Sequence, residues 1–334
     1  MKEAWRSFSG LIAQYGFTRG LKRFVIATAT VVLTTLFVLI VYSAPQNQND
    51  ESNTRQQTGA TDWKAVEQAL GKAGSMQPGD VYKVSLPRSD LKVTAAGVEL
   101  KPALALGTWI AFKRMGEMTV VMGDLVLAEN EVTPVLSKLQ QGGVETTALH
   151  NHVLNESPRV MYMHIHAMGD AVTIAKAIHD ALALTKTPFA ASASTATAEI
   201  GIDTKQIDQI MGQSGNVNGG VYQFSIARAD EITDVTGDHK MAIPSAMGLA
   251  QAINFQPTGA GKAAITGDFV LLASEVTPVM KALRENGIEV TAVHSHMLTE
   301  NPRLFFMHFW ANDDALKLAT GLRAGLDKVN VRRQ

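Results

Sequence analysis

An internal repeat constrains the fold of this chain more than any other feature. The segment that begins at Gly123 reads GDLVLAENEVTPVLSKLQQGGVETTALHNHVLNESPRVMYMHIHAMGDA, and it recurs from Gly267 as GDFVLLASEVTPVMKALRENGIEVTAVHSHMLTENPRLFFMHFWANDDA. About half of the aligned positions are identical, and upstream VYKVSLPRSD from Val81 matches VYQFSIARAD from Val221. We therefore expect a tandem duplication, with a first copy at residues 61–186, a linker at residues 187–200 and a second copy at residues 201–334.

Each copy combines patterns typical of strands and of helices. The alternating segments VYKVSL and VYQFSI predict strands. Thr133-Pro134 and Thr277-Pro278 predict helix starts. Further helix N-caps are expected at Thr61-Asp62, Asp170, Asp203 and Asp314, helix ends at Gly142 and Gly287, and turns at Gly97 and Gly237. The predicted fold class is α+β, in which each copy is an antiparallel-sheet unit with a β-α-β-β-α core.

The N-terminal part carries a membrane signal. Residues 24–43, FVIATATVVLTTLFVLIVYS, contain no charged residue and are long enough to span a bilayer as one helix. Arg19, Lys22 and Arg23 precede them, so we expect residues 1–23 in the cytoplasm and the rest of the chain facing the periplasm or the exterior. Residues 44–60 are polar and are expected to be a flexible linker. The alternative to this inner-membrane anchor is a secreted protein whose signal peptide is cleaved.

Composition excludes several classes of function. The chain has no cysteine among its 334 residues, which excludes disulfides, zinc–thiolate sites, iron–sulfur clusters and a thiol nucleophile. Any metal must therefore be held by His, Asp, Glu or water. The formal net charge is −1 and neither half contains a basic block, so we expect no nucleic-acid partner.

Histidines gather in the repeated segment. The first copy contains LHNH and MHIH on either side of a turn that contains Pro158, and the second copy contains VHSH and MHFW. Because alternate side chains of a strand share a face, antiparallel pairing across this turn would bring the histidines of each copy together. Trp310 stands where the second copy would have its fourth histidine.

This pattern predicts a metal centre. Imidazoles two residues apart, a third from a neighbouring strand and a nearby carboxylate form a common ligand set for divalent transition metals, of which zinc is our first expectation. The expected metal ligands are His150, His152, His164, His294, His296 and His308. Whether the two copies form one shared site or two is left open. The alternative is an ordinary hairpin in which half-buried histidines bond to the backbone or to carboxylates.

Three residues near the histidines are candidates for catalysis. Glu156 would serve as a ligand or a general base, and His166 as a fourth ligand or a proton shuttle. Arg159 would hold a carboxylate or phosphate of a substrate, or pair with Glu156.

Other acidic residues retained in both copies have simpler explanations. Asp124 and Asp268 follow a glycine at an expected strand start, so they are either turn residues or further carboxylate ligands. Glu131 and Glu275 are expected to stabilise helix N-termini through their charge.

The repeated motifs resemble those of a known family. EVTPV, then TALHNH or TAVHSH, then PRVMYMH or PRLFFMH are similar to the LppY/LpqO family of bacterial envelope proteins, whose domain has no settled activity. The resemblance covers most of the chain after the linker and implies an envelope location, but not a reaction. HNHVLNE and HSHMLTE also have the HxHxxxE spacing of the first cupin metal motif. A cupin is a β-barrel, and the helix signals between the strands disfavour that fold.

Two functions are compatible with these features. The leading hypothesis is a metal-dependent envelope enzyme that activates a metal-bound water for hydrolysis, and the sequence does not specify its substrate. The alternative is a non-catalytic envelope module that binds a metal, a glycan, a small molecule or a protein partner. Trp310, Phe305, Phe306 and Tyr162 would then either stack on a sugar or fill the core.

Overall fold

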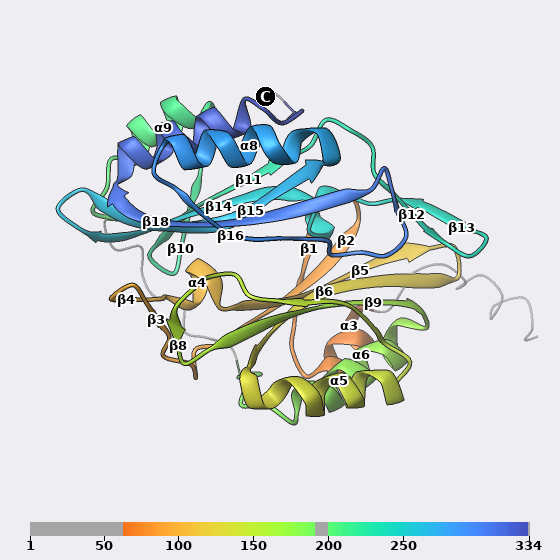
Figure 1. Ribbon diagram of the computed structural model, residues 1–334. Helices are drawn as coiled ribbons and strands as arrows, with labels where there is room; N and C mark the ends of the chain where they lie inside the picture. The colour runs from red at the N-terminus through yellow and green to blue at the C-terminus, as the bar shows by residue number, and fades with distance from the viewer. Residues whose placement is uncertain (1–62, 191–199, 333–334) are drawn as a thin grey trace, which may run out of the picture. The chain divides into compact units, whose positions relative to one another are not determined.

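The duplication is visible in a computed structural model that describes residues 63–190 and 200–332 (Figure 1). The elements of repeat one are α3 (Trp63–Leu70), β1 (Ser75–Gln77), β2 (Val81–Pro87), β3 (Thr94–Ala95), β4 (Val98–Glu99), α4 (Pro102–Ala105), β5 (Gly107–Met115), β6 (Met118–Ala128), α5 (Val132–Gln141), β7 (Glu145–His150), β8 (Glu156–Ser157), β9 (Val160–Gly169) and α6 (Ala171–Leu182). A short 3-10 helix, η1 (Glu129–Glu131), precedes α5.

Repeat two follows the same order. Its elements are α7 (Thr204–Met211), β10 (Asn216–Asn218), β11 (Val221–Ala227), β12 (Thr233–Thr236), β13 (His239–Ala242), the 3-10 helix η2 (Ser245–Met247), β14 (Ala250–Gly259), β15 (Lys262–Leu272), α8 (Ala273–Glu285), β16 (Glu289–His294), β17 (Glu300–Asn301), β18 (Leu304–Asp314) and α9 (Ala315–Leu326). The predicted α+β class and the tandem duplication are confirmed for the described residues, and the β-α-β-β-α core corresponds to β6, α5, β7, β9 and α6.

Each repeat forms one six-stranded antiparallel sheet. The strand order is β1-β2-β5-β6-β9-β7 in repeat one and β10-β11-β14-β15-β18-β16 in repeat two. The same topology in both sheets places β7 and β16 at corresponding edges. The short strands form two further three-stranded sheets, β4-β3-β8 and β13-β12-β17.

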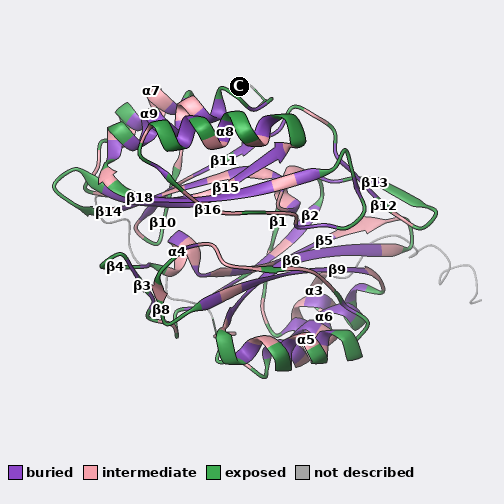
Figure 2. Cartoon of the chain, viewed as in Figure 1, coloured by how far each residue is buried: buried purple, intermediate pink, exposed green. Residues whose placement is uncertain are grey.

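The two sheets face each other, with α3, α5 and α6 on the outer face of one sheet and α7, α8 and α9 on the outer face of the other, whereas α4 lies between the sheets (Figure 1). Each repeat has its own core between sheet and helices, one around Phe112 and one around Phe269. Two more apolar clusters mix residues of both repeats, such as Met122 with Phe306 and Tyr162 with Trp310. Both repeats belong to one compact unit. Figure 2 shows that buried residues line the facing sheets, whereas exposed residues gather on the outer helices.

Helix ends follow the sequence signals, with one correction. Asp170, Asp203 and Asp314 cap their helices as predicted, because each carboxylate accepts backbone N–H groups of the first turn. The prediction of helix starts at Thr133 and Thr277 was wrong, since α5 begins at Val132 and α8 at Ala273.

Two glutamates at these helix starts, Glu131 just before α5 and Glu275 in the first turn of α8, explain the earlier starts. Glu131 accepts the backbone N–H of Ala128 at 2.9 Å, and Glu275 that of Leu272 at 2.7 Å. Each glutamate is also paired with a buried arginine, Arg88 at 2.8 Å and Arg228 at 2.7 Å. These pairs join the end of the second strand of each repeat to the start of its central helix, so the glutamates have a structural role.

The predicted membrane segment at residues 24–43, its flanks at residues 1–23 and 44–60, and the predicted N-cap Thr61-Asp62 lie outside the described residues. Among the helices that the structure describes, none is long and apolar enough to cross a membrane.

Candidate metal centre

The edge strands β7 and β16 meet where the two sheets face each other. The Thr147 hydroxyl donates to the carbonyl of His296 at 2.6 Å, and the Thr291 hydroxyl donates to the carbonyl of His152 at 2.6 Å. Thr147 and Thr291 are equivalent in the repeat, as are His152 and His296, so these two hydrogen bonds are related by an approximate two-fold axis. They fix the histidine segments of the two repeats against each other.

The six predicted ligands are interleaved about this axis. The rings of His150 and His294, which are equivalent positions, have centroids 3.6 Å apart. The rings of His164 and His296 are also 3.6 Å apart. The reciprocal pair, His152 and His308, is separated by 3.8 Å. Each histidine of one repeat therefore lies on a histidine of the other, and the structure brings all six together in one shared cluster.

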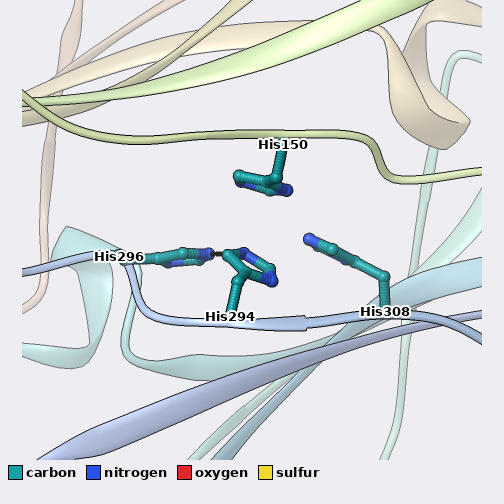
Figure 3. A group of neighbouring side chains, drawn as sticks. All are labelled: His150, His294, His296 and His308. Carbon is teal, nitrogen blue, oxygen red and sulfur yellow. Dashed lines mark hydrogen bonds between the residues drawn. The ribbon is translucent and has the colours of Figure 1, made fainter.

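Four of these histidines surround a common point (Figure 3). One ring nitrogen from each of His150, His294, His296 and His308 lies within 4.8 Å of the others. The Nδ1 atom of His308 donates to the Gly267 carbonyl at 2.7 Å, which leaves the Nε2 lone pair free. Nδ1 of His150 likewise contacts the Asn151 carbonyl at 3.1 Å. A backbone carbonyl on one ring nitrogen is the usual way in which proteins orient a metal-binding imidazole.

Two aspartates complete the cluster, the buried Asp124 and the half-buried Asp268. Asp124 lies 3.7 Å from Nε2 of His152 and 3.9 Å from Nε2 of His164. Asp268 lies 3.5 Å from Nε2 of His296 and 3.8 Å from Nδ1 of His308. These separations exceed hydrogen-bond length, and those to the Nε2 atoms approach the roughly 3.3 Å expected between two ligand atoms of one tetrahedral zinc ion.

Of the two interpretations of Asp124 and Asp268, turn residue or further carboxylate ligand, the first was wrong. They lie in the middle of β6 and β15, on the strand face that bears the histidines. The preceding glycines are required by close packing, because a Cβ atom at Gly267 would lie 1.9 Å from the Ala252 carbonyl oxygen, and one at Gly123 would lie 2.8 Å from that of Trp109. The repeated Gly-Asp pair therefore marks a point where two neighbouring strands of the sheet approach each other closely.

Unsatisfied polar atoms concentrate in this cluster. Of ten buried side-chain nitrogen and oxygen atoms without a hydrogen-bond partner among the described residues, seven belong to these histidines and aspartates. They are Asp124 Oδ1, His150 Nε2, His152 Nε2, His164 Nε2, Asp268 Oδ1, His294 Nδ1 and His308 Nε2. Since an unpartnered buried polar group is costly, so many in one place indicate a missing common partner. The donor set of imidazole nitrogens and carboxylate oxygens fits a divalent transition metal.

The protonation states also suit a cation. Burial lowers the pKa of all six histidines, to about 4 for His150 and about 3 for His308, so their rings are neutral at pH 7. Burial raises the pKa of Asp124 to about 7. Burial and the charge of Asp124 raise the pKa of Asp268 well above its usual value. A metal would stabilise the ionised carboxylates and needs neutral imidazoles, so binding would release protons rather than take them up.

Aromatic rings pack against two histidines of the cluster. Tyr162 stacks on His152 with ring centroids 3.3 Å apart, and its equivalent Phe306 stacks on His296 at 3.5 Å. Both aromatic side chains are fully buried, and Trp310 is 7% exposed. These residues fill the core rather than offer a surface on which a sugar could stack.

His166 lies apart from the six-histidine cluster. Its Nε2 is 3.0 Å from Asp234 Oδ2 of repeat two, and its Nδ1 is 3.6 Å from Glu145 Oε2. Burial alone would lower the pKa of His166, but the hydrogen bond and charge of Asp234 outweigh it and raise the pKa. The structure thus gives His166 two carboxylate partners and places it outside the group of four converging histidines.

Glu156 and Arg159 lie in the turn before β9. Glu156 accepts the backbone N–H of Val160 at 3.0 Å, and its equivalent Glu300 accepts that of Leu304 at 3.0 Å. Arg303, the equivalent of Arg159, contacts Glu300 at 3.4 Å. The contacts of Glu156 and Glu300 stabilise the turn. Neither glutamate belongs to the group formed by His150, His294, His296 and His308.

A cation near Asp124, Lys83, was not predicted from the sequence. Lys83 on β2 lies over the Trp109 ring at 4.2 Å and donates to the Ala246 carbonyl of repeat two at 3.2 Å. Burial lowers the pKa of Lys83 to about 8, and the charge of Asp124 opposes this shift. Its equivalent in repeat two is the neutral Gln223, and this difference between the copies was the only sequence signal for it.

Comparison with known proteins places the chain in a family. Residues 64–184 and 205–328 each match the family model described as Domain of Unknown Function (DUF1259). The chain belongs to this family. The two matched segments lie inside the two predicted copies, so the DUF1259 domain is present as a tandem repeat.

Other comparisons add little to this DUF1259 assignment. Among curated proteins, none matches the chain. Two solved structures are similar in part: a trimeric bacterial microcompartment shell protein, PduB, with 14% identity over 79% of this chain and 97% of that chain, and EtuB from Clostridium kluyveri, with 11% identity over 77% and 91%. Their TM-scores are 0.20 and 0.18, which is too low to carry an argument about fold or function.

Proposed function

We propose that this chain is an envelope protein that binds a divalent transition metal, zinc being the first choice, at one centre shared by its two repeats. The observation that carries the proposal is the concentration of seven unsatisfied buried donor atoms on histidines and aspartates from both repeats. Neutral imidazoles held by backbone carbonyls support it further. The centre is shared because each repeat supplies rings that lie between those of the other.

The envelope location in this proposal rests on the sequence. The uncharged segment at residues 24–43, preceded by basic residues, supports an inner-membrane anchor with the repeats facing the periplasm or exterior, and cleavage with secretion is the alternative. Within the DUF1259 family, the TALHNH and PRVMYMH motifs support placing the chain with the LppY/LpqO proteins.

Metal-dependent hydrolysis is the second candidate function. It requires a coordination position that water and substrate can reach. His150 and His294 are half-buried, whereas His164 and His308 are only 4% and 2% exposed, so access to the centre is from the side of His150 and His294. Because His164 and His308 are so deeply buried, metal binding is favoured as the primary function. A hydrolytic substrate would have to reach the metal from the side of His150 and His294.

Elemental analysis of the full-length chain, purified without a histidine tag, tests the proposal. We expect near-stoichiometric metal in the wild type and its loss in both His150→Gln and His294→Gln, because each repeat supplies an essential ligand. His239→Gln is the matched control, since His239 is an exposed histidine on β13 outside the cluster. Absence of metal in the wild type after reconstitution with Zn²⁺ would contradict the proposal.

A further inference from the structure

Lys83 and Gln223 occupy equivalent positions in the two sheets. Lys83 pairs with Ala111, which pairs with Met122, and Gln223 pairs with Asn254, which pairs with Thr266. Met122 and Thr266 each precede the aspartate of their repeat by two residues, so Lys83 and Gln223 lie on the same strand face as Asp124 and Asp268, respectively.

The two side chains also make equivalent contacts. Lys83 donates to the carbonyl of Ala246, within η2 of the opposite repeat, at 3.2 Å. Gln223 donates to the carbonyl of Ala103, within α4 of the opposite repeat, at 2.7 Å. The main difference between the two positions is therefore the positive charge, which only repeat one carries there.

This charge makes the two aspartates unequal. Lys83 and Asp124 attract each other electrostatically without forming an ion pair, so part of the charge of Asp124 is already offset by a nearby cation. Asp268 instead feels the like charge of Asp124. An added cation is therefore repelled by Lys83 on one side of the two-fold axis and attracted by an uncompensated carboxylate on the other.

The histidine positions show the same asymmetry. The group of four converging nitrogens contains three histidines of repeat two, and only His150 from repeat one. By two-fold symmetry a second group would contain His150, His152 and His164 with His294, but this arrangement does not converge among the described residues. Charge and geometry thus favour the same half of the cluster.

Resting on the proposed metal centre, we propose that the centre takes a single ion, held in the half that contains Asp268, and that Lys83 takes the place of a second ion beside Asp124. The ligands of the single ion are His150, His294, His296 and His308, with Asp268 beside them. Lys83 is thus a residue that determines the stoichiometry of the centre.

Exchanging the two equivalent residues tests this inference. Lys83→Gln removes the charge but keeps a side chain that can donate to the Ala246 carbonyl. We expect the wild type to bind one equivalent of Co²⁺ and Lys83→Gln to bind two, with affinity for the second ion raised roughly tenfold or more. Gln223→Lys places a cation beside Asp268 and should weaken binding of the first ion by a similar factor.

The readout is titration of the full-length chain with Co²⁺, followed by visible absorption and calorimetry, with circular dichroism as a check that each variant is folded. Lys113→Gln is the control, because Lys113 donates to the Gly79 carbonyl on the exposed surface and should leave the stoichiometry at one. Two equivalents in the wild type, or one equivalent in Lys83→Gln, would overturn the inference while leaving the metal centre intact. No Co²⁺ binding by any of these proteins would overturn the metal centre itself.

Discussion

Glu156 shows how one residue of a repeated motif acquires an unusual environment. One carboxylate oxygen accepts the backbone N–H of Val160, and the other is buried without a partner among the described residues. Burial raises the pKa of Glu156 to about 7, from a usual value of 4.5. The folded state therefore holds its proton more tightly than the unfolded state does.

This shift predicts a pH-dependent loss of stability. The contribution of protonated Glu156 is fully present below about pH 4.5 and is lost as the pH rises through about 7. In Glu156→Gln this titration is absent, so the variant should become more stable relative to the wild type between pH 5 and pH 8. Urea unfolding at both pH values measures the difference. Parallel pH profiles for the two proteins would show that Glu156 ionises normally in the folded chain.

Individual residue types were predictable from the sequence where a local pattern specified them. The six histidines could be predicted because they recur at equivalent positions of the two repeats. Asp170 and Asp314 could be predicted because a helix N-terminus needs a side-chain acceptor. Asp234, which pairs with His166, was not found. The two residues are 68 positions apart and belong to different repeats, so no local pattern links them.

At the scale of elements, the edge strands β7 and β16 connect the two repeats. Their tie consists of two equivalent hydrogen bonds, from Thr147 and Thr291 to the backbone of the opposite histidine segment. A side-chain hydrogen bond of this kind contributes about 1 kcal/mol to the free energy of unfolding. Because its acceptors are carbonyls of His152 and His296, the tie also holds two of the proposed donors in place.

Replacing both hydroxyls tests the role of this tie. Thr147→Val with Thr291→Val should lower the free energy of unfolding by about 2 kcal/mol and weaken metal binding, because the two histidine segments lose their mutual anchor. Thr320→Val is the control, since Thr320 is exposed and its hydroxyl donates to the Leu316 carbonyl of the same helix. Denaturant unfolding and a Zn²⁺ titration on the same samples provide the two measurements. Unchanged Zn²⁺ affinity in the double variant would mean that the tie does not position the centre.

The elements themselves were largely predictable, but their boundaries depended on distant partners. The strand-helix alternation and the turns at Gly97 and Gly237 agree with the structure, where both glycines have positive φ angles. The starts of α5 and α8 were misplaced because Glu131 and Glu275 are fixed by Arg88 and Arg228, more than 40 residues earlier. A sequence pattern shows that a glutamate precedes a helix, but it does not show which arginine the chain brings to it.

At the scale of the whole molecule, the duplication builds a histidine cluster that neither copy has alone. The sequence predicted two copies with similar histidine hairpins, and it left open whether they make one centre or two. The answer depends on the packing of one sheet against the other, which places His150 on His294 and His164 on His296. Such packing is set by the apolar faces of both sheets together, and a comparison of the chain with itself cannot reveal it.

The most direct test of the shared centre is a crystal structure of the chain grown with Zn²⁺, with diffraction recorded on both sides of the zinc absorption edge. We predict one anomalous peak, from a zinc ion bound by His150 of repeat one and by His294, His296 and His308 of repeat two. Crystals grown with a chelator should lack it. A zinc-containing crystal whose six histidines show no anomalous peak, and instead bond to water or to one another, would contradict the claim that the two repeats together build a metal centre.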